Sequence, residues 1–458
     1  MKPFYTAFLL LTSLFHQVLA QQKSPHVSGE VEINRAEGLI KCDLYLNNLP
    51  DLGKQYKVLL NRGFNIGLWR DDSGKVLKYS GFYDSNLLGE AVPYLPYSGN
   101  DTLKLPAKLR LTYTGAFPVY IDTLNSFDFK GFIAFNSNTV RAADQSKWYP
   151  VIYDVKNDRE LQDVTYDIDV TCKDCETIYI NGSAAKAGPQ ARLRSNVARP
   201  LLLFAGNYKV QPLENSTFLN AELTPDEAAV FNENINTIVD FYKSYLKVPF
   251  GAKITFLQHQ AVEPYGPKRS WGFVTFPTIA VAGKSFKSEI DTQKRLFVNT
   301  YSYAFYAHEM GHYYFGNVLK PNSTLKWFFL ESMAEFLSIK ATENKYGKDA
   351  TRKYIDERRS MMKDWKVKPL PEITKPDQIG EGYRYNYAPL MLLVMERRFG
   401  TKAMQLFCQK ALQNAGKETD YNLLVNTVKS AGISNEQWQL FEKEVISQSE
   451  CKKVFDYL

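Results

Sequence analysis

Hydrophobic and polar residues alternate along the first part of the chain, from about residue 27 to residue 210. A period of two is typical of strands that bury one face. Turn-forming Gly, Asn, Asp and Pro separate the strand-like stretches. The clearest stretches are residues 27–33, 55–60, 103–113, 164–170 and 176–180. The pattern predicts an N-terminal β-sandwich or saddle-shaped β domain over residues 21–210.

Near residue 211 the pattern changes to a helical period. The segment Thr224-Pro225-Asp226-Glu227 predicts a helix start, with Thr as the cap, Pro at the first position and acids in the first turn. We expect this helix to reach about Leu246. Short strands are expected near residues 253–257 and 272–281, with helices from there onward. The whole chain is therefore predicted to be an α+β multidomain protein, with residues 211–458 mainly α-helical.

Length and charge narrow the class of protein. A chain of 458 residues is too long for one ordinary domain. Its net charge is +7, but the basic residues are scattered, so we expect a solvated surface and no nucleic-acid binding. Residues 1–20 combine Lys2, an apolar run and a small residue, Ala20, which predicts a secretory signal peptide cleaved before Gln21. We therefore expect a secreted or periplasmic protein without a transmembrane segment.

The chain has five cysteines, Cys42, Cys172, Cys175, Cys408 and Cys451, and an odd count leaves at least one unpaired. In a secreted protein, the closely spaced Cys172 and Cys175 form either a local disulfide or two free thiols. A four-thiolate metal site would need a second such pair, which the sequence lacks.

The segment of residues 301–340 carries the most distinctive chemistry. It contains the sequence HEMGH at residues 308–312. On a helix, residues four apart lie on the same face, so His308 and His312 can present two imidazoles to one metal ion. Glu309 lies about 100° further round the helix and can reach a water on that ion without being a ligand. This layout predicts a zinc-dependent hydrolase.

A hydrolytic zinc site usually has three protein ligands and one open position. We expect the third ligand on a second helix, over residues 326–340. Eighteen residues separate His312 from Glu331, and turn signals between them allow two antiparallel helices. That arrangement would return Glu331 to the histidines. Glu335, one turn later, is either an acceptor for the other ring nitrogen of a ligand histidine or an exposed carboxylate.

The motif, the spacing to Glu331 and the Phe-Gly-Asn at residues 315–317 resemble the signature of gluzincin zinc metallopeptidases related to aminopeptidase N, the membrane alanyl aminopeptidase family. Weaker similarities lie at residues 111–115, 148–150 and 204–208. The resemblance implies a thermolysin-like catalytic domain in which His308, His312 and Glu331 bind one Zn²⁺ per chain, and a peptide or protein substrate. The tail after about Phe399 is too short for the large helical C-terminal domain of many relatives, so we expect a short form.

The resemblance also implies two catalytic roles. Glu309 would take a proton from the attacking water and deliver it to the leaving amine. A tyrosine on a later helix would donate a hydrogen bond to the oxyanion. Tyr385 falls at that position of the family, and Tyr383 and Tyr387 are alternatives.

One stretch departs from the family pattern. The family carries a Gly-x-Met-Glu-Asn strand whose Glu binds the free α-amine of the substrate, and residues 271–277 match it here. Thr275 falls where that Glu should be, and a neutral side chain cannot pair with an ammonium group. Glu263, in the preceding loop, is a candidate replacement. We therefore expect an aminopeptidase-like enzyme with altered N-terminus recognition. The alternatives are an endopeptidase of the same fold and a catalytically silent, zinc-stabilised peptide-binding protein.

Overall fold

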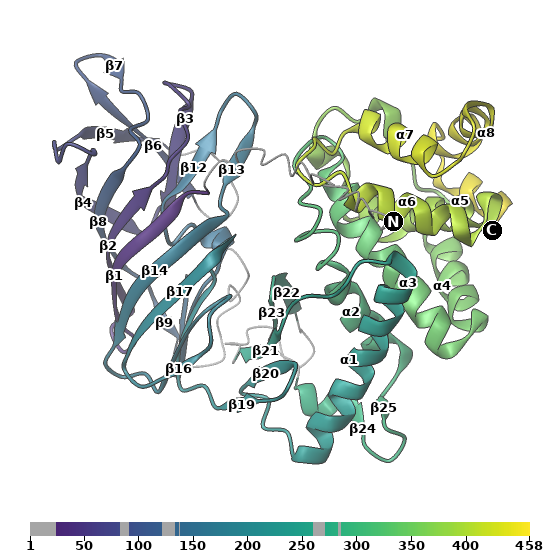
Figure 1. Ribbon diagram of the computed structural model, residues 1–458, viewed down its shortest axis with the longest axis horizontal. Coiled ribbons are helices and arrows are strands. Elements are labelled where there is room, and N and C mark those ends of the chain that lie inside the picture. The colour runs from purple at the N-terminus through teal and green to yellow at the C-terminus, as the bar shows by residue number, and fades with distance from the viewer. Residues whose placement is uncertain (1–23, 83–90, 121–132, 137, 260–270, 283–284) are drawn as a thin grey trace, which may run out of the picture.

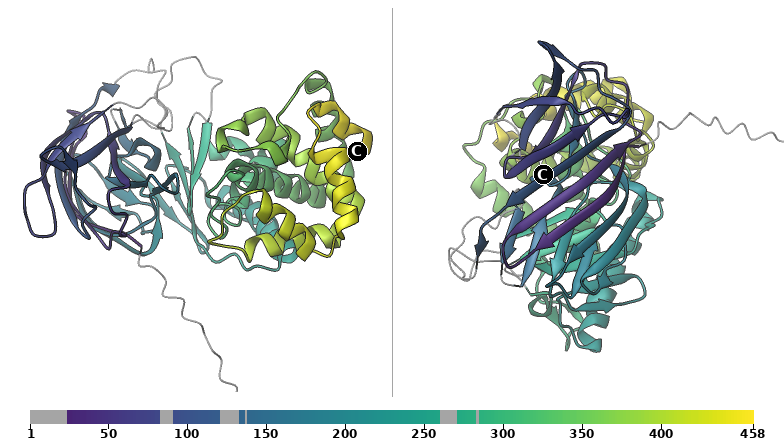
Figure 2. Two further views of the ribbon diagram at one scale, coloured as in Figure 1. Left: turned by 90° about the horizontal axis from the view of Figure 1, so that it is seen from above. Right: turned by 90° about the vertical axis from the view of Figure 1, so that its left-hand side faces the viewer.

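The computed structural model of the chain describes residues 24–82, 91–120, 133–136, 138–259, 271–282 and 285–458. The expected signal peptide, residues 1–20, and the candidate Glu263 lie outside the described residues. A β-rich N-terminal part lies beside a mainly helical C-terminal part, as Figure 1 shows and as Figure 2 shows from above. The predicted α+β multidomain class is therefore confirmed. No helix in the described ranges is long and apolar enough to cross a membrane.

The largest sheet of the N-terminal part has the strand order β17-β14-β1-β2-β8-β4. Its strands are β1 (His26–Asn34), β2 (Leu39–Asn47), β4 (Phe64–Arg70), β8 (Leu109–Ala116), β14 (Val164–Cys172) and β17 (Gln190–Arg199). β1 pairs in parallel with β14 and antiparallel with β2. Every second side chain of β14 is buried, which is the period-two pattern expected of a strand with one covered face.

Two further sheets complete the N-terminal part. One has the order β16-β15-β18-β11-β10-β9, and the other has the order β13-β12-β3-β6-β5, with β7 paired to β6. The first contains β9 (Val119–Tyr120), β10 (Ile133–Asn136), β11 (Thr139–Ala142), β15 (Thr177–Ile180), β16 (Lys186–Ala187) and β18 (Leu203–Gly206). The second contains β3 (Tyr56–Asn61), β5 (Lys78–Gly81), β6 (Ala91–Ser98), β7 (Asp101–Thr102), β12 (Val151–Asp154) and β13 (Arg159–Leu161).

The C-terminal part begins with a five-stranded sheet of order β19-β20-β21-β23-β22, which lies between the N-terminal sheets and the helices (Figure 1). The strands of this part are β19 (Val210–Pro212), β20 (Ser216–Leu219), β21 (Ile254–His259), β22 (Trp271–Thr275), β23 (Thr278–Ala282), and the short pair β24 (Ile290–Asp291) and β25 (Leu296–Phe297). The helices are α1 (Pro225–Leu246), α2 (Thr300–Gly311), α3 (Met333–Tyr346), α4 (Lys348–Met361), α5 (Ala388–Phe399), α6 (Thr401–Leu412), α7 (Tyr421–Ser430) and α8 (Asn435–Phe441).

Helix α1 has the bounds that its sequence predicts. The Thr224 side chain accepts a hydrogen bond from the backbone N–H of Glu227, and the Glu227 carboxylate accepts one from the backbone N–H of Thr224. This reciprocal capping box satisfies two N–H groups that a helix end leaves without partners.

Two strand predictions differ from the structure. The expected strand over residues 103–113 starts only at Leu109. Residues 103–108, which follow β7, form an irregular segment. The expected strand over residues 272–281 is two antiparallel strands, β22 and β23, which turn at Phe276-Pro277. Pro277 cannot donate a ladder hydrogen bond, so the chain reverses there instead of continuing.

Each part has its own apolar core, and a third, smaller cluster lies between them. Leu202, Phe204 and Tyr208 of the N-terminal part pack there against Leu219 and other residues of the five-stranded sheet. We call this third cluster the seam; its buried members are Ala143, Tyr179, Leu202, Phe204, Tyr208, Leu219, Leu257 and Ala280. The seam fixes the two parts against each other because its side chains would be exposed if the parts separated.

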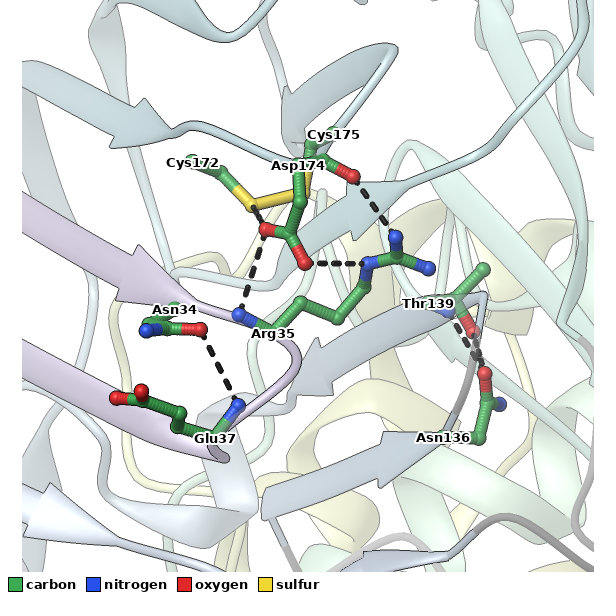
Figure 3. Close-up of a disulfide and its surroundings, with 8 residues drawn as sticks. All are labelled: Asn34, Arg35, Glu37, Asn136, Thr139, Cys172, Asp174 and Cys175. Carbon is green, nitrogen blue, oxygen red and sulfur yellow. Dashed lines mark hydrogen bonds and ion pairs between the residues drawn. A yellow bond between two sulfur atoms is a disulfide. The ribbon is translucent and has the colours of Figure 1, made fainter.

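Figure 3 shows the disulfide that joins Cys172 to Cys175, so the local-disulfide prediction is confirmed. Asp174, between the two cysteines, accepts a hydrogen bond of 3.2 Å from Nε of Arg35, and its backbone carbonyl accepts one of 2.9 Å from Nη2 of the same side chain. The remaining cysteines, Cys42, Cys408 and Cys451, are free and buried.

Candidate metal centre

Helices α2 and α3 place the two histidines and Glu331 together. His308 lies in the last turn of α2 and His312 directly follows its end. A Cβ atom on Gly311 would lie only 3.1 Å from Cα of Ala334 in α3. The missing side chain therefore lets the two helices approach closely, and this approach returns the second helix to the histidines.

The second helix is not a regular α-helix over residues 326–340. It starts with a π-helical turn, η4 (Phe328–Ser332), which carries Glu331 and leads into α3. A second π-helical turn, η7 (Tyr383–Tyr387), precedes α5 and carries Tyr385. Single π turns are rare and often occur at functional sites, because the extra residue redirects the side chains of that turn.

The three predicted ligands surround one point. Oε2 of Glu331 lies 3.4 Å from Nε2 of His308 and 3.4 Å from Nε2 of His312. All three side chains are only 11–12% exposed. Oε2 of Glu331 is buried and has no hydrogen-bond partner among the described residues. Ligand atoms at the corners of a tetrahedron, each about 2.1 Å from a zinc ion, would be about 3.4 Å apart. The residues present therefore fit a divalent metal ion.

Two neighbours orient the histidine rings. Nδ1 of His308 lies 2.8 Å from Oε2 of Glu335, and Nδ1 of His312 lies 3.4 Å from the backbone carbonyl of Phe315. The structure thus places Glu335 in the acceptor position rather than on an exposed face. Such partners fix the ring so that Nε2 points at the metal position, and they raise the basicity of the ligand.

The charges of the two histidines and of Glu331 act on one another. Burial alone would lower the pKa of His308, but Glu331 and Glu335 outweigh it and raise that pKa well above its usual range. Burial alone would raise the pKa of Glu331, but the two histidines bring it well below its usual range. Glu331 therefore stays ionised, and the pocket favours a cation next to it.

Glu309 and Tyr385 lie near this group. Glu309 is buried on α2, and its charge contributes to the raised pKa of both His308 and Tyr385. The ring centres of Tyr385 and His308 are 5.8 Å apart. Burial is the main cause of the raised pKa of Tyr385, and the Glu331 carboxylate adds to it. The phenol therefore stays protonated at neutral pH and can donate a hydrogen bond.

The alternative tyrosines point elsewhere. Tyr383 and Tyr387 stack edge-to-face with ring centres 5.4 Å apart, and both belong to the apolar core. The Tyr387 hydroxyl donates to the backbone carbonyl of Gln448, and burial raises the pKa of Tyr383 with Cys451 nearby. Of the three, only Tyr385 contacts the group of the two histidines and Glu331.

Thr275 ends strand β22, next to the metal-binding helix. A Cβ atom on Gly272 would lie 2.7 Å from Cζ of Phe305, so the glycine lets α2 pack directly on this strand. The Thr275 hydroxyl donates a hydrogen bond of 3.0 Å to Oδ1 of Asp144. Asp144 belongs to the N-terminal part and is buried, and burial raises its pKa although Lys147 and Thr275 oppose the effect. A carboxylate thus stands next to Thr275 after all, supplied by a different segment.

Sequence reasoning missed Asp144 because nothing in its local pattern distinguishes it from an ordinary loop aspartate. It also missed Lys326, which precedes η4 and lies near Glu331. A basic residue at the start of an otherwise apolar helix was the only available signal.

The fold is that of the M1 zinc metallopeptidases. Yeast LTA4 hydrolase is similar over 91% of this chain and 66% of its own, with a TM-score of 0.61 and 13% identity. An M1 zinc metallopeptidase mutant from Deinococcus radiodurans, bound to a Tyr-Ser-Ala substrate, is similar over 93% of this chain and 95% of its own, with a TM-score of 0.62 and 13% identity. A two-domain M1 zinc metallopeptidase mutant bound to L-tryptophan is similar over 93% of this chain and 96% of its own, with a TM-score of 0.62 and 13% identity.

These similarities confirm the predicted resemblance at the level of the fold. The chain spans 66% of the yeast protein, slightly under two thirds, and nearly the full length of the other two. No family model and no curated protein matches the sequence.

Proposed function

We propose that this protein is a zinc-dependent metallopeptidase that hydrolyses peptide bonds and acts on the N-terminal end of its substrates. The observation that carries the proposal is the placement of His308, His312 and Glu331 around one point, with Glu309 and Tyr385 beside it. The solved structures of similar fold support the reaction class, since they include a zinc metallopeptidase bound to a short peptide.

His308, His312 and Glu331 would hold the zinc ion, one per chain. When bound, zinc polarises the scissile carbonyl and acidifies a water molecule. Glu335 orients the His308 ring for this role through the contact at Nδ1.

The chain's own residues move the proton and stabilise charge. Glu309 accepts the proton of the attacking water and delivers it to the leaving amine. Tyr385 donates a hydrogen bond to the oxygen that becomes negative as the carbonyl is attacked. Its raised pKa suits this role, because an ionised phenol would repel that oxygen.

Asp144 supports recognition of a free α-amine despite Thr275. Its buried carboxylate is held by the Thr275 hydroxyl at the position where the family strand carries Glu. Burial raises the pKa of Asp144 because its charged form is poorly solvated. The ammonium group of a substrate would stabilise that charged form. On this proposal, Asp144 binds the α-amine of the substrate in place of the Glu that the family carries on its strand.

The test is hydrolysis of a peptide library by the zinc-loaded protein, with and without a chelator, followed by mass spectrometry of the products. Cleavage after the first residue that stops with chelator, and that N-acetylation of the peptide blocks, is the expected result. Cleavage of blocked peptides at internal bonds would favour an endopeptidase of the same fold. Zinc binding without any turnover would favour a silent peptide-binding protein.

We also propose a secreted or periplasmic location, on the pattern of residues 1–20. Residues 21–210 and 211–458 are proposed as the β domain and a thermolysin-like catalytic domain. Detection of a mature protein that begins at Gln21 outside the cytoplasm tests the location.

A further inference from the structure

Two cationic side chains lie beside the candidate metal centre. Lys326 comes five residues before Glu331, and Arg384 directly precedes Tyr385. Both lie against the same aromatic ring, that of Trp327, with Nζ of Lys326 5.1 Å and the guanidinium carbon of Arg384 4.4 Å from its centre. The Arg384 guanidinium is also 5.2 Å from the Tyr385 ring centre. The two cations are therefore held next to the residues that would act on the scissile bond.

Within the part of the chain that the structure describes, neither cation pairs with a buried anion. Within the described residues, the ammonium group of Lys326 makes no hydrogen bond or ion pair. The one ion pair of Arg384 within the same ranges is a 3.6 Å contact with Glu381, whose side chain is 85% exposed. Nε of Arg384 is buried, and no described residue provides a hydrogen-bond partner for it. Enclosed charges and N–H groups without partners are costly, so they are typically kept where a ligand supplies the missing group.

Lys326 also lies where the two parts of the molecule meet. Burial lowers its pKa, and the charges that act on it come both from Glu160 and Asp144 in the N-terminal part and from Glu331 in the C-terminal part. Glu160 itself pairs with Lys147 at 2.8 Å, so it is not available as a close partner for Lys326. A peptide that reaches from Asp144 to the metal centre would pass close to this lysine.

We propose that Lys326 and Arg384 bind a carboxylate of the peptide substrate. The shared ligand chemistry is a carboxylate, which comes either from the C-terminus of a short peptide or from an acidic side chain. The planar guanidinium of Arg384 suits two-point binding of a carboxylate, and Lys326 adds a second positive charge. Trp327 holds both cations in place. This inference rests on the proposed peptidase function and specifies its substrate class as short or acidic anionic peptides.

The experiment compares matched peptides. One pair differs only at the C-terminus, as the free acid and the amide of the same tripeptide. A second pair, both amidated, carries Asp or Asn at one internal position. The wild-type protein is expected to prefer the anionic member of one pair by about 10- to 100-fold in kcat/KM, mainly through KM, because charge-assisted hydrogen bonds have this strength. The pair that shows the preference identifies the source of the carboxylate.

Variants test whether the two cations cause the preference. Lys326→Gln is expected to reduce the ratio between the anionic and neutral peptides to near one. Arg384→Lys, which keeps the charge, should retain more of the ratio than Arg384→Gln. Lys363→Gln is the matched control, since the Lys363 side chain is 76% exposed and its ion pair with Asp364 is a surface contact. It should leave the ratio unchanged.

Binding provides a readout that does not depend on turnover. Calorimetry with the Glu309→Gln protein should give tighter binding of the anionic peptide of the same pair. If the wild type cleaves peptides but treats both pairs alike, the carboxylate site is overturned while the peptidase function stands. If no peptide is cleaved, the proposed peptidase function fails. In that case calorimetry still tests the carboxylate site, and equal affinity for the anionic and the neutral peptide would overturn it.

Discussion

The Thr275 hydroxyl and the Asp144 carboxylate form a hydrogen bond of 3.0 Å across the two parts of the molecule. Thr275 ends strand β22 of the five-stranded sheet, and Asp144 comes from the short 3-10 turn after β11. The bond links the β-rich part to the edge strand beside the metal-binding helix. It also brings a carboxylate to a strand whose own side chain is neutral.

Replacing Asp144 by Asn should weaken substrate binding without weakening the fold. KM for peptides with a free α-amine is expected to rise about 10- to 100-fold, because a charge-assisted contact is lost. Burial raises the pKa of Asp144 in the folded protein. At any pH above the pKa of the unfolded chain, the charged carboxylate therefore lowers the free energy of unfolding. Removing this charge should leave the melting temperature unchanged or raise it. Steady-state kinetics and calorimetric melting check both statements. Asp356→Asn on the exposed face of α4 is the control, and an unchanged KM in Asp144→Asn would contradict the amine-binding role.

Glu309→Gln should abolish most turnover and keep the metal. Loss of a general base typically costs about 100- to 10,000-fold in kcat. Glutamine has nearly the same shape, so the zinc content should stay at one ion per chain by elemental analysis. Wild-type rates in this variant would show that another group moves the proton.

Tyr385→Phe tests the assignment of the oxyanion donor. Removal of one such donor is expected to lower kcat about 100- to 1,000-fold, with a smaller change in KM. Tyr383→Phe and Tyr387→Phe are the matched controls, since both rings pack in the core away from the metal centre. A larger loss of kcat in either control than in Tyr385→Phe would move the role to that residue.

Glu335→Gln should weaken metal binding rather than chemistry. The Glu335 carboxylate contacts Nδ1 of His308 at 2.8 Å, and loss of such a partner typically lowers metal affinity about 10- to 100-fold. Competition with a chromophoric chelator measures the affinity. At saturating zinc, kcat should recover most of its wild-type value. Glu357→Gln, at an exposed position of α4, should leave the affinity unchanged.

The grouping of His308, His312 and Glu331 could be predicted because it follows from local geometry. Two histidines four apart share a helix face wherever that helix lies, and the eighteen-residue spacing to Glu331 allows one helical hairpin. The start of α1 was likewise predictable, since a capping box involves only Thr224 and its near neighbours. The π turns that carry Glu331 and Tyr385 were not predictable, because each inserts one extra residue into the helical repeat and no residue type marks such an insertion.

Contacts between distant segments escaped prediction. Asp144 and Thr275 are 131 positions apart, and no local sequence pattern predicts the hydrogen bond between them. The surroundings of Lys326 were not predictable for the same reason, because they include residues of both parts of the molecule. The hairpin of β22 and β23 was read as one strand, since both its halves are apolar and periodicity alone does not mark the reversal at Pro277.

For the proposed peptidase, the seam between the two parts has a consequence for the products of cleavage. Asp144 is attached to one side of this apolar contact, and the two histidines are attached to the other. On the proposed function, the packing of residues such as Leu219 and Tyr208 sets how far the anchored end of a peptide lies from the bond that is cut. On this proposal, larger or smaller side chains in the seam would change the length of the released fragment, because they would shift Asp144 relative to the two histidines.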